Sequence, residues 1–332
     1  MENRLATRGP PAHLPGPNEH CWCGSGKKYK RCHLSADRGA PRPAVASPPS
    51  RPVKKGRVSP LRTVPAHIPR PDYATSGLPV DQPVNEVMIG ERLERMRRAC
   101  RAAAQVLKLG GQAVRVGITT DEIDALVHDE YLRLGGYPST LNYHGFPKSL
   151  CTSINEVICH GIPDSTVVRD GDIVKVDITA FKDGVHGDNC GSVVAGAGSP
   201  EAVARVEATR EALARGIAAV KPGREVNVIG RVIESYATRN GYESVRNYTG
   251  HGVGPAFHSG LVIPHYDSAP MHADVIKPGM VFTVEPMLVA GSELNYEWDD
   301  GWTVSTDDGS LCAQFEHTIV VTDDGAEVLT LP

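Results

Sequence analysis

Two aspartates within one short stretch carry the first pattern with chemical meaning. The stretch DITAFKDGVHGD covers residues 177–188, and the turn signal KDG inside it predicts a β-hairpin. Pairing across this turn places Asp177 opposite or nearly opposite Asp188, although like charges facing each other destabilise a ladder. The preceding run GDIVKV is apolar enough for a buried strand, so water alone does not solvate Asp177. The pattern therefore predicts a cation between the two carboxylates.

Two glutamates interrupt apolar runs in the same way. Glu285 lies in GMVFTVEPMLV and Glu316 lies in CAQFEHTIVV. Four buried carboxylates without partners would be very costly, and these strand-like segments contain only Lys175 and Lys182 as cations. Because four separate ion pairs cannot be formed from so few cations, the sequence favours a bound metal.

A histidine completes the predicted ligand set. The stretch GHGVGPAFHSG offers His251 and His258 as candidates. Carboxylate oxygens with one imidazole suit Mn, Fe, Co or Zn at a coordination number above four. Four carboxylates carry too much charge for one dication, whereas two dications about 3.5–4 Å apart would balance them. We therefore expect a dinuclear site, and the sequence leaves the physiological metal open.

A second metal site is predicted near the N-terminus. The stretch CWCGSGKKYKRCH supplies three thiolates and one imidazole, a complete tetrahedral set for structural zinc: Cys21, Cys23, Cys32 and His33. The spacing is not that of the usual zinc finger, and a flexible basic tail with incidental cysteines is the alternative. The stretch resembles the SEC-C motif, a short zinc-binding module, at all four positions. We expect this module to occupy residues 1–34.

The elements that must position these residues follow an α+β order. Apolar periodicity predicts helices at 85–109, 119–136, 200–219 and 225–241. Thr120 or Asp121 is the predicted cap of the helix at 119–136. Strand-and-turn segments are expected at 151–159, 171–195, 280–288 and 313–322. Along the chain, a pair of helices followed by strands occurs twice, and this order suggests two similar halves.

Composition divides the 332 residues into a basic arm and an acidic body. Residues 1–70 have a net charge of +11, so the remaining residues carry −15 to give −4 overall. Such an arm points to an acidic partner such as nucleic acid. Residues 1–71 hold 13 of the 26 prolines, and we expect residues 35–70 to form an extended linker. PxxP-like pieces could instead bind an SH3-type groove, but a spacer is favoured. Residues 71–332 would form the catalytic domain.

The predicted compartment is the cytoplasm. No run of 18 apolar residues occurs, and the N-terminal stretch lacks the apolar core of a signal peptide. We therefore expect no membrane contact, and eight cysteines do not imply disulfides in that compartment. A monomer is the expected oligomeric state.

Five ordered motifs carry a family resemblance from about Val64 to the C-terminus: CHGIPD, GDIVKVDITAFKDGVHGD, GHGVGPAFH, VEPML and FEHTIVV. Together they resemble type I methionine aminopeptidases of the M24, or pita-bread, metallopeptidases. The resemblance implies two pseudo-symmetric halves with a central curved antiparallel sheet flanked by helices. It also implies a dinuclear ligand set: Asp177, Asp188, His251, Glu285 and Glu316. Within this set Asp188 and Glu316 would bridge the two ions.

The resemblance also implies an activity. Such enzymes remove the N-terminal methionine of nascent proteins and peptides when the second residue is small, through attack of a metal-activated water. Glu285 would shuttle protons, while His258 would face the carbonyl oxygen and His160 the scissile nitrogen. The implied methionine pocket consists of Tyr143, Phe146, Cys151, Phe257 and Trp302. Thr140 stands where relatives often have Cys or Pro, which leaves its effect on the pocket open.

Two alternatives remain at this point. A prolidase or aminopeptidase P shares the ligands, but YHGFPKSLCTSINEVICHGIPD resembles a methionine pocket. A binding protein without catalysis would lack ligands, and none is missing. Glu285 follows His258 by 27 positions, which leaves no room for the helical insertion of type II enzymes. We further hypothesise that the basic arm contacts the ribosome, as eukaryotic type I relatives also carry N-terminal zinc modules.

Overall fold

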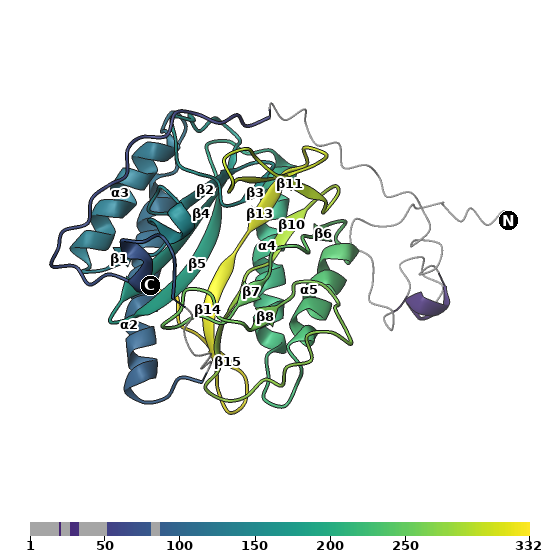
Figure 1. Cartoon of the computed structure of the whole chain (residues 1–332). Coiled ribbons are helices and arrows are strands. Elements are labelled where there is room, and N and C mark those ends of the chain that lie inside the picture. The colour runs from purple at the N-terminus through teal and green to yellow at the C-terminus, as the bar shows by residue number, and fades with distance from the viewer. Residues whose placement is uncertain (1–19, 21–26, 33–51, 81–86) are drawn as a thin grey trace.

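The computed structural model describes residue 20 and residues 27–32, 52–80 and 87–332 (Figure 1). Three of the four predicted zinc ligands, Cys21, Cys23 and His33, lie outside these residues. Within 27–32 the chain makes one 3-10 turn, η1 (Tyr29–Arg31), and Cys32 follows it directly.

The hairpin predicted around the two aspartates is present and longer than expected. It consists of β4 (Ile173–Lys182) and β5 (Val185–Val194). Asp183 and Gly184 form the turn, with φ angles of 55° and 82°, as a two-residue type I′ turn requires. Thr179 pairs with Asp188, and Asp177 pairs with Cys190. The two aspartates are therefore diagonal neighbours on one face, which agrees with the prediction that they lie nearly opposite each other.

This hairpin is the centre of the largest sheet. The strand order is β1-β4-β5-β14-β15, with β2 paired to β4 and β9 paired to β14, all antiparallel. The added strands are β1 (Tyr137–Pro138), β2 (Cys151–Ile154), β9 (Val281–Val284), β14 (Glu316–Val321) and β15 (Ala326–Val328). Because Glu316 pairs with Cys190, this register carries the last predicted ligand close to Asp188.

Three small sheets complete the strand content of the described residues. They contain β13 (Cys312–Gln314), β10 (Met287–Val289) and β6 (Glu243–Ser244); β11 (Asn295–Glu297), β12 (Val304–Thr306) and β3 (Val157–Cys159); and β7 (Gly250–His251) with β8 (Val262–Ile263). All eight strands of these sheets are only two or three residues long, too short to show a periodicity. β3 and parts of β10 and β13 fall within the predicted segments 151–159, 280–288 and 313–322, whereas the other five strands were not predicted.

The four predicted helices are confirmed with small shifts at their ends. They are α2 (Glu91–Ala113), α3 (Thr120–Arg133), α4 (Pro200–Ala219) and α5 (Asn227–Arg239). The cap predicted for α3 was wrong by one residue, because Thr119 accepts from the Glu122 amide and the Glu122 side chain accepts from the Thr119 amide.

The helices form two pairs, α2 with α3 and α4 with α5, which lie to the left and to the right of the central strands in Figure 1, in agreement with the predicted two halves. Helix α2 packs on β4 and β5, whereas α4 packs on α5 and β13. The contact of α2 with β5 is very close at Gly187, where a Cβ would lie 2.5 Å from the Cys100 nitrogen. Only glycine allows this approach. Among the described residues no helix combines the length and apolar character needed to span a bilayer.

The structure differs from the expected free linker over residues 52–70. These residues belong to a longer segment, 52–80, which lies against the body and which we call the strap. Val64 and Ile68 are buried in a cluster with Tyr137, Leu141 and Phe181. The Val53 amide also donates to Glu156. The strap is prolonged by the turn η2 (Asp72–Ala74). Its apolar residues are too few for a sequence pattern, and only some of them, such as Val64, Ile68 and Tyr73, are buried against the body.

Candidate metal centre

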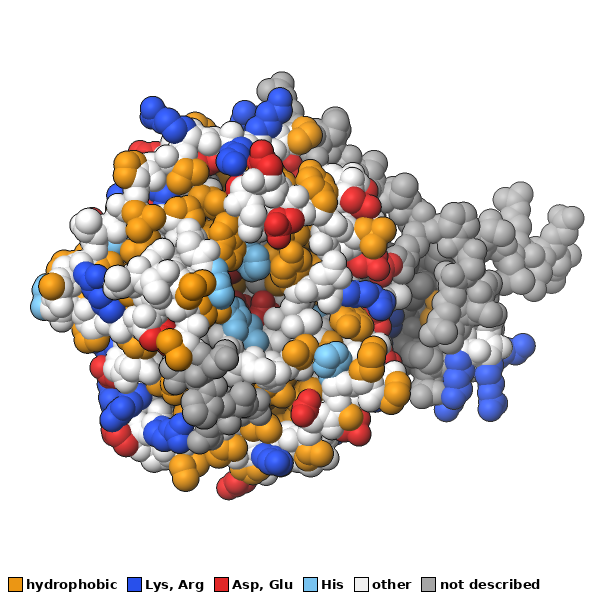
Figure 2. Space-filling model, in the orientation of Figure 1, with side chains coloured by type: hydrophobic (Ala, Val, Ile, Leu, Met, Phe, Trp, Pro, Cys, Tyr) orange, Lys and Arg blue, Asp and Glu red, His pale blue; other side chains and the backbone are white. Residues whose placement is uncertain are grey.

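One cavity of about 410 Å³ brings the predicted site residues together. Its lining includes all the candidates of the body: Tyr143, Phe146, Cys151, His160, Asp177, Asp188, His251, Phe257, His258, Glu285, Trp302 and Glu316. In the space-filling view the molecule is hollowed at this place, with histidines at the sides and acidic atoms at the bottom (Figure 2). Residues from both halves of the chain therefore share one site.

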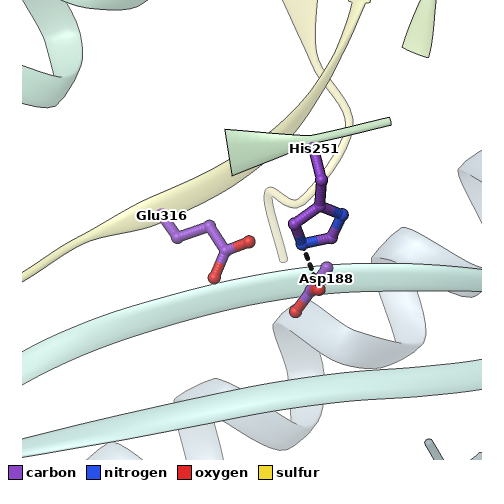
Figure 3. Close-up of side chains that lie close together, drawn as sticks. All are labelled: Asp188, His251 and Glu316. Carbon is purple, nitrogen blue, oxygen red and sulfur yellow. Dashed lines mark ion pairs between the residues drawn. The ribbon is translucent and has the colours of Figure 1, made fainter. Parts of the chain in front are cut away.

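The floor of the cavity is a compact group of metal-ligand types. Ligand atoms of Asp188, His251 and Glu316 all lie within 4.8 Å of one another (Figure 3). His251 Nε2 is 3.7 Å from Asp188 Oδ2 and 3.7 Å from Glu285 Oε1. Glu285 directly follows β9, and Asp177 reaches the same cavity from β4. Four strands thus bring candidate ligands to the same cavity, and a fifth ends beside it.

The histidine of this group is oriented as a metal ligand would be. Its Nδ1 lies 3.2 Å from the carbonyl oxygen of Gly252, so the Nδ1 hydrogen is donated to that oxygen. The Nε2 lone pair is then free to face the carboxylates. The backbone amide of His251 also donates to Thr283 Oγ1 at 2.9 Å. Such hydrogen bonds fix the tautomer and direction of ligating histidines.

Among the described residues, no lysine or arginine forms an ion pair with these carboxylates. Burial raises the pKa of Asp177 to about 7. Burial, reinforced by a neighbouring carboxylate, also raises the pKa of Asp188, Glu285 and Glu316 well above their ordinary values. Glu316 Oε1 is buried and has no hydrogen-bond partner among the described residues.

The two lysines of the neighbouring strands do not supply that charge. Lys175 Nζ donates to the carbonyl oxygens of Asn155 and Cys312, each at 2.9 Å. Lys182 Nζ donates to the Leu134 carbonyl oxygen at 2.8 Å. The acidic floor is therefore left for an external cation, and its oxygen-rich donor set with one imidazole fits divalent metal ions.

Three supporting residues were missed in the sequence. Thr179 Oγ1 donates to Asp188 Oδ1 at 2.7 Å, and Thr283 Oγ1 donates to Glu285 Oε1 at 2.8 Å. His265 Nε2 accepts the backbone N–H of Glu285 at 3.0 Å. The sequence could have indicated Thr283, because a residue two positions before Glu285 lies on the same side of an extended strand. His265 offered none.

The wall of the cavity is largely aromatic and is built from loops. Phe146 meets Trp302 edge to face, with ring centroids 5.1 Å apart, and Tyr143 lies 4.8 Å from Phe257. Cys151 begins β2 and pairs with Asp177. Burial raises the pKa of its thiol, so the sulfur is neutral and soft. A wall of this kind suits an apolar side chain with a polarisable atom.

The loop that carries Tyr143 has an unusual backbone. Asn142 and His144 have φ angles of 63° and 47°, and Gly145 has a φ of 84°. A non-glycine residue in this region costs roughly 1 kcal/mol or more, and such a conformation persists only where its surroundings fix it. Thr140 also lines the cavity, and its Oγ1 donates to the Lys148 carbonyl oxygen at 2.9 Å.

Two further histidines line the cavity above the acidic floor. His160 packs edge to face on Tyr248 and Trp302, and burial lowers its pKa to about 4. His258 Nδ1 lies 3.0 Å from Tyr143 Oη. Burial and the nearby His251 lower the pKa of His258 as well. Both imidazoles are therefore neutral near pH 7 and can each donate one hydrogen bond.

Comparison with known proteins identifies the family. Residues 94–323 match the model of metallopeptidase family M24, and residues 18–35 match the SEC-C motif. The chain belongs to the M24 metallopeptidases, which use divalent metals. Within them it belongs with the methionine aminopeptidases. Methionine aminopeptidase 2 of Mycobacterium tuberculosis is 55% identical over 278 residues, which cover 83% of this chain and 96% of that protein.

Other relatives agree. Methionine aminopeptidase 1 of Saccharomyces cerevisiae is 44% identical over 320 residues, covering 93% of this chain and 82% of the relative. The crystal structure of methionine aminopeptidase from Rickettsia prowazekii matches with a TM-score of 0.73 and 41% identity, over 75% of this chain and all of that one. A prolidase from Pyrococcus furiosus matches with a TM-score of 0.60 at 21% identity, which shows a shared fold alone. The predicted fold is thereby confirmed.

Proposed function

We propose that this chain removes the N-terminal methionine of nascent proteins and peptides whose second residue is small. Two divalent ions, of Co, Mn, Fe or Zn, would be held by Asp177, Asp188, His251, Glu285 and Glu316. The observation that carries the proposal is the acidic floor without a protein cation, set beneath an aromatic wall. The family membership and the names of the relatives support it.

Each part of the site has a task in peptide hydrolysis. The bound ions would bring the pKa of a water ligand toward neutrality and so supply the nucleophile. Glu285 would hold the proton that the leaving amine needs and deliver it there, and the Thr283 hydroxyl donates to its Oε1 and keeps it in place. Asp188 is held in the same way by Thr179. The threonines leave the carboxylates little freedom, which preorganises the site.

His258 would stabilise the developing oxyanion, and its hydrogen bond determines how. Burial raises the pKa of Tyr143 to about 12, so its hydroxyl is protonated and can donate to His258 Nδ1. The hydrogen of the neutral ring then resides on Nε2, available to the carbonyl oxygen of the substrate. His160, on the side of Tyr248 and Trp302, would donate toward the scissile nitrogen or the adjoining peptide.

Selectivity follows from the cavity wall. The rings of Tyr143, Phe146, Phe257 and Trp302, with the sulfur of Cys151, would bind a methionine side chain by dispersion. Because the reacting groups lie at the floor, the second residue of the substrate must enter the same recess. Small second residues are therefore preferred.

A substrate panel tests this function. We expect release of methionine from Met-Ala and Met-Gly peptides and little release from Met-Leu or Met-Lys peptides. Comparable turnover of Xaa-Pro peptides, with none of Met-Ala, would instead place the protein with the prolidases and aminopeptidases P. A protein that hydrolyses none of them with added dications would be a binding protein on this scaffold.

The enzyme would be of type I. Residues 259–284, which separate His258 from Glu285, contain short strands and loops and no helix. This stretch therefore has no counterpart of the helical insertion that marks type II enzymes. The stretch 143–164 resembles a methionine pocket rather than a proline site, which favours methionine over proline specificity within the shared fold.

We also propose that the arm tethers a monomeric, cytoplasmic enzyme to the ribosome. Cys21, Cys23, Cys32 and His33 would hold one structural zinc, a proposal that the SEC-C match supports. The basic arm would then meet RNA phosphate where nascent chains emerge. Deletion must stop before the strap, so the test removes residues 1–51. Peptide hydrolysis should persist, while ribosome co-sedimentation should weaken in a salt-dependent way. Equal sedimentation of both proteins would refute the tether.

A further inference from the structure

The loop that forms one side of the methionine pocket is held from behind by the strap. We call residues 139–150 the pocket loop, because Tyr143 and Phe146 on it line the cavity. Near its start, Tyr73 Oη donates to the Ser139 carbonyl oxygen at 2.6 Å. The His144 amide donates to the Gly77 carbonyl oxygen at 2.7 Å. The second of these contacts falls on the part of the loop whose backbone is left-handed.

The same region has a side-chain contact to the strap. Asn142 Nδ2 donates to the Ala74 carbonyl oxygen at 3.1 Å. Tyr73 also packs edge to face on Tyr143, with ring centroids 5.0 Å apart. Because Asn142 and His144 adopt a disfavoured φ, their conformation needs outside support. The strap supplies a hydrogen bond to each of them.

The other end of the pocket loop is fixed by a buried charge cluster. Lys148 has no exposed side-chain surface, and its ammonium donates to Asp121 and, at 2.5 Å, to Ser59 Oγ. It also lies 3.7 Å from Asp124, which has no exposed side-chain surface either. Asp124 Oδ1 in turn accepts the backbone N–H of Ser149 at 2.7 Å. Both aspartates belong to helix α3.

The strap completes this cluster with a second cation. Arg62 Nε donates to Asp124 Oδ2 at 2.6 Å, and its Nη2 donates to the Asp121 carbonyl oxygen at 3.1 Å. Two carboxylates then face two cations. Without Arg62, the fully buried Asp124 would share one lysine with Asp121, and an under-compensated buried charge is strongly unfavourable. The lysine and the Ser149 amide that anchor the loop would be the first groups to shift.

We propose that the strap is a template for the methionine pocket and that Arg62 is its main positioning residue. Arg62 does not touch substrate. It holds the pocket loop through Asp124, while Tyr73 holds the loop independently at its other end. Displacement of a binding wall by about 1 Å can cost on the order of a hundredfold in activity, so these contacts bear on substrate affinity and not only on stability. The inference rests on the proposed function for its substrate.

The test compares substitutions at both attachment points in the full chain. Arg62→Ala should raise KM for a Met-Ala peptide about tenfold, with bound metal close to wild type, because only the pocket loop moves. The accompanying fall in kcat should not exceed that of Tyr143→Phe, since the same loop carries the hydroxyl that orients His258. Arg62→Lys should recover part of this loss. Tyr73→Phe keeps the ring and removes the hydroxyl, and it should raise KM by a smaller factor. Arg57→Ala is the matched control, because Arg57 is an exposed strap arginine whose side chain takes no part in the cluster.

Two further readouts keep the outcomes apart. Hydrogen exchange of residues 140–148 should speed up in Arg62→Ala and not in Arg57→Ala, whatever the substrate is. If both Arg62→Ala and Tyr73→Phe keep the wild-type KM and exchange rates and only lower the melting temperature, the proposal is wrong. Should Arg62→Ala fail to fold, Tyr73→Phe decides. A wild-type protein without activity on Met-Ala refutes the proposed function instead, and the exchange result still judges the template.

Discussion

The floor and the wall of the cavity are built in different ways. The floor takes its proposed ligands from β4, β5, β7 and β14 and from the residue after β9, so strand register sets their positions. The wall takes Tyr143, Phe146, Phe257 and Trp302 from loops. Strands hold atoms in place through ladder hydrogen bonds, whereas loops depend on side-chain contacts behind them. The comparison suggests that the metal chemistry is fixed by the sheet and that substrate selectivity can vary without disturbing it.

The comparison predicts the largest effect at the floor. Asp188→Asn removes one charge from the group of three ligands, so activity on Met-Ala should fall on the order of 10³-fold or more and metal content should drop. Asp183→Asn is the matched control, since it makes the same change in the exposed turn of the same hairpin. The variant is measured by steady-state kinetics and metal analysis. Full activity of Asp188→Asn would contradict the claim that the floor, and not the wall, carries the metal-dependent chemistry.

A histidine above the floor should give a smaller loss of another kind. His160→Ala removes a hydrogen-bond donor to the reacting peptide, so kcat should fall by roughly 10²-fold while metal is retained. Metal content and kcat are measured on the same preparation. Loss of metal in this variant would mean that His160 belongs to the floor.

Removal of one hydroxyl from the wall should have the smallest effect. Tyr143→Phe keeps the ring but frees His258 Nδ1, so kcat should fall about 5- to 10-fold, the value of one hydrogen bond. In the background of His258→Ala the same substitution should cost almost nothing, because the residue it orients is gone. An equal loss in both backgrounds would show that Tyr143 acts through the pocket and not through His258.

The sequence revealed the floor more fully than the wall for a physical reason. A carboxylate such as Asp188 or Glu316 inside an apolar strand is out of place, and a shortage of cations points to metal. Phe146 and Cys151 look like ordinary core residues, so only the family resemblance singled them out. The strap was missed over residues 52–70, because the attachment of Arg62 depends on a buried partner 62 positions away in the chain. Helices with clear periodicity were predicted, while most strands of two or three residues, such as β7 and β8, lay outside the predicted segments.

Direct counting of metal in the body tests the central claim best. The wild-type protein and its Asp188→Asn and Glu316→Gln variants, stripped of metal and lacking residues 1–51, would be titrated with Mn²⁺ and examined by native mass spectrometry. We predict that the wild type binds two ions, that Met-Ala hydrolysis appears with them and that both variants lose at least one. Two ions bound equally by all three proteins, or full hydrolysis in the stripped wild type, would contradict the assignment of the acidic floor as a dinuclear metal centre.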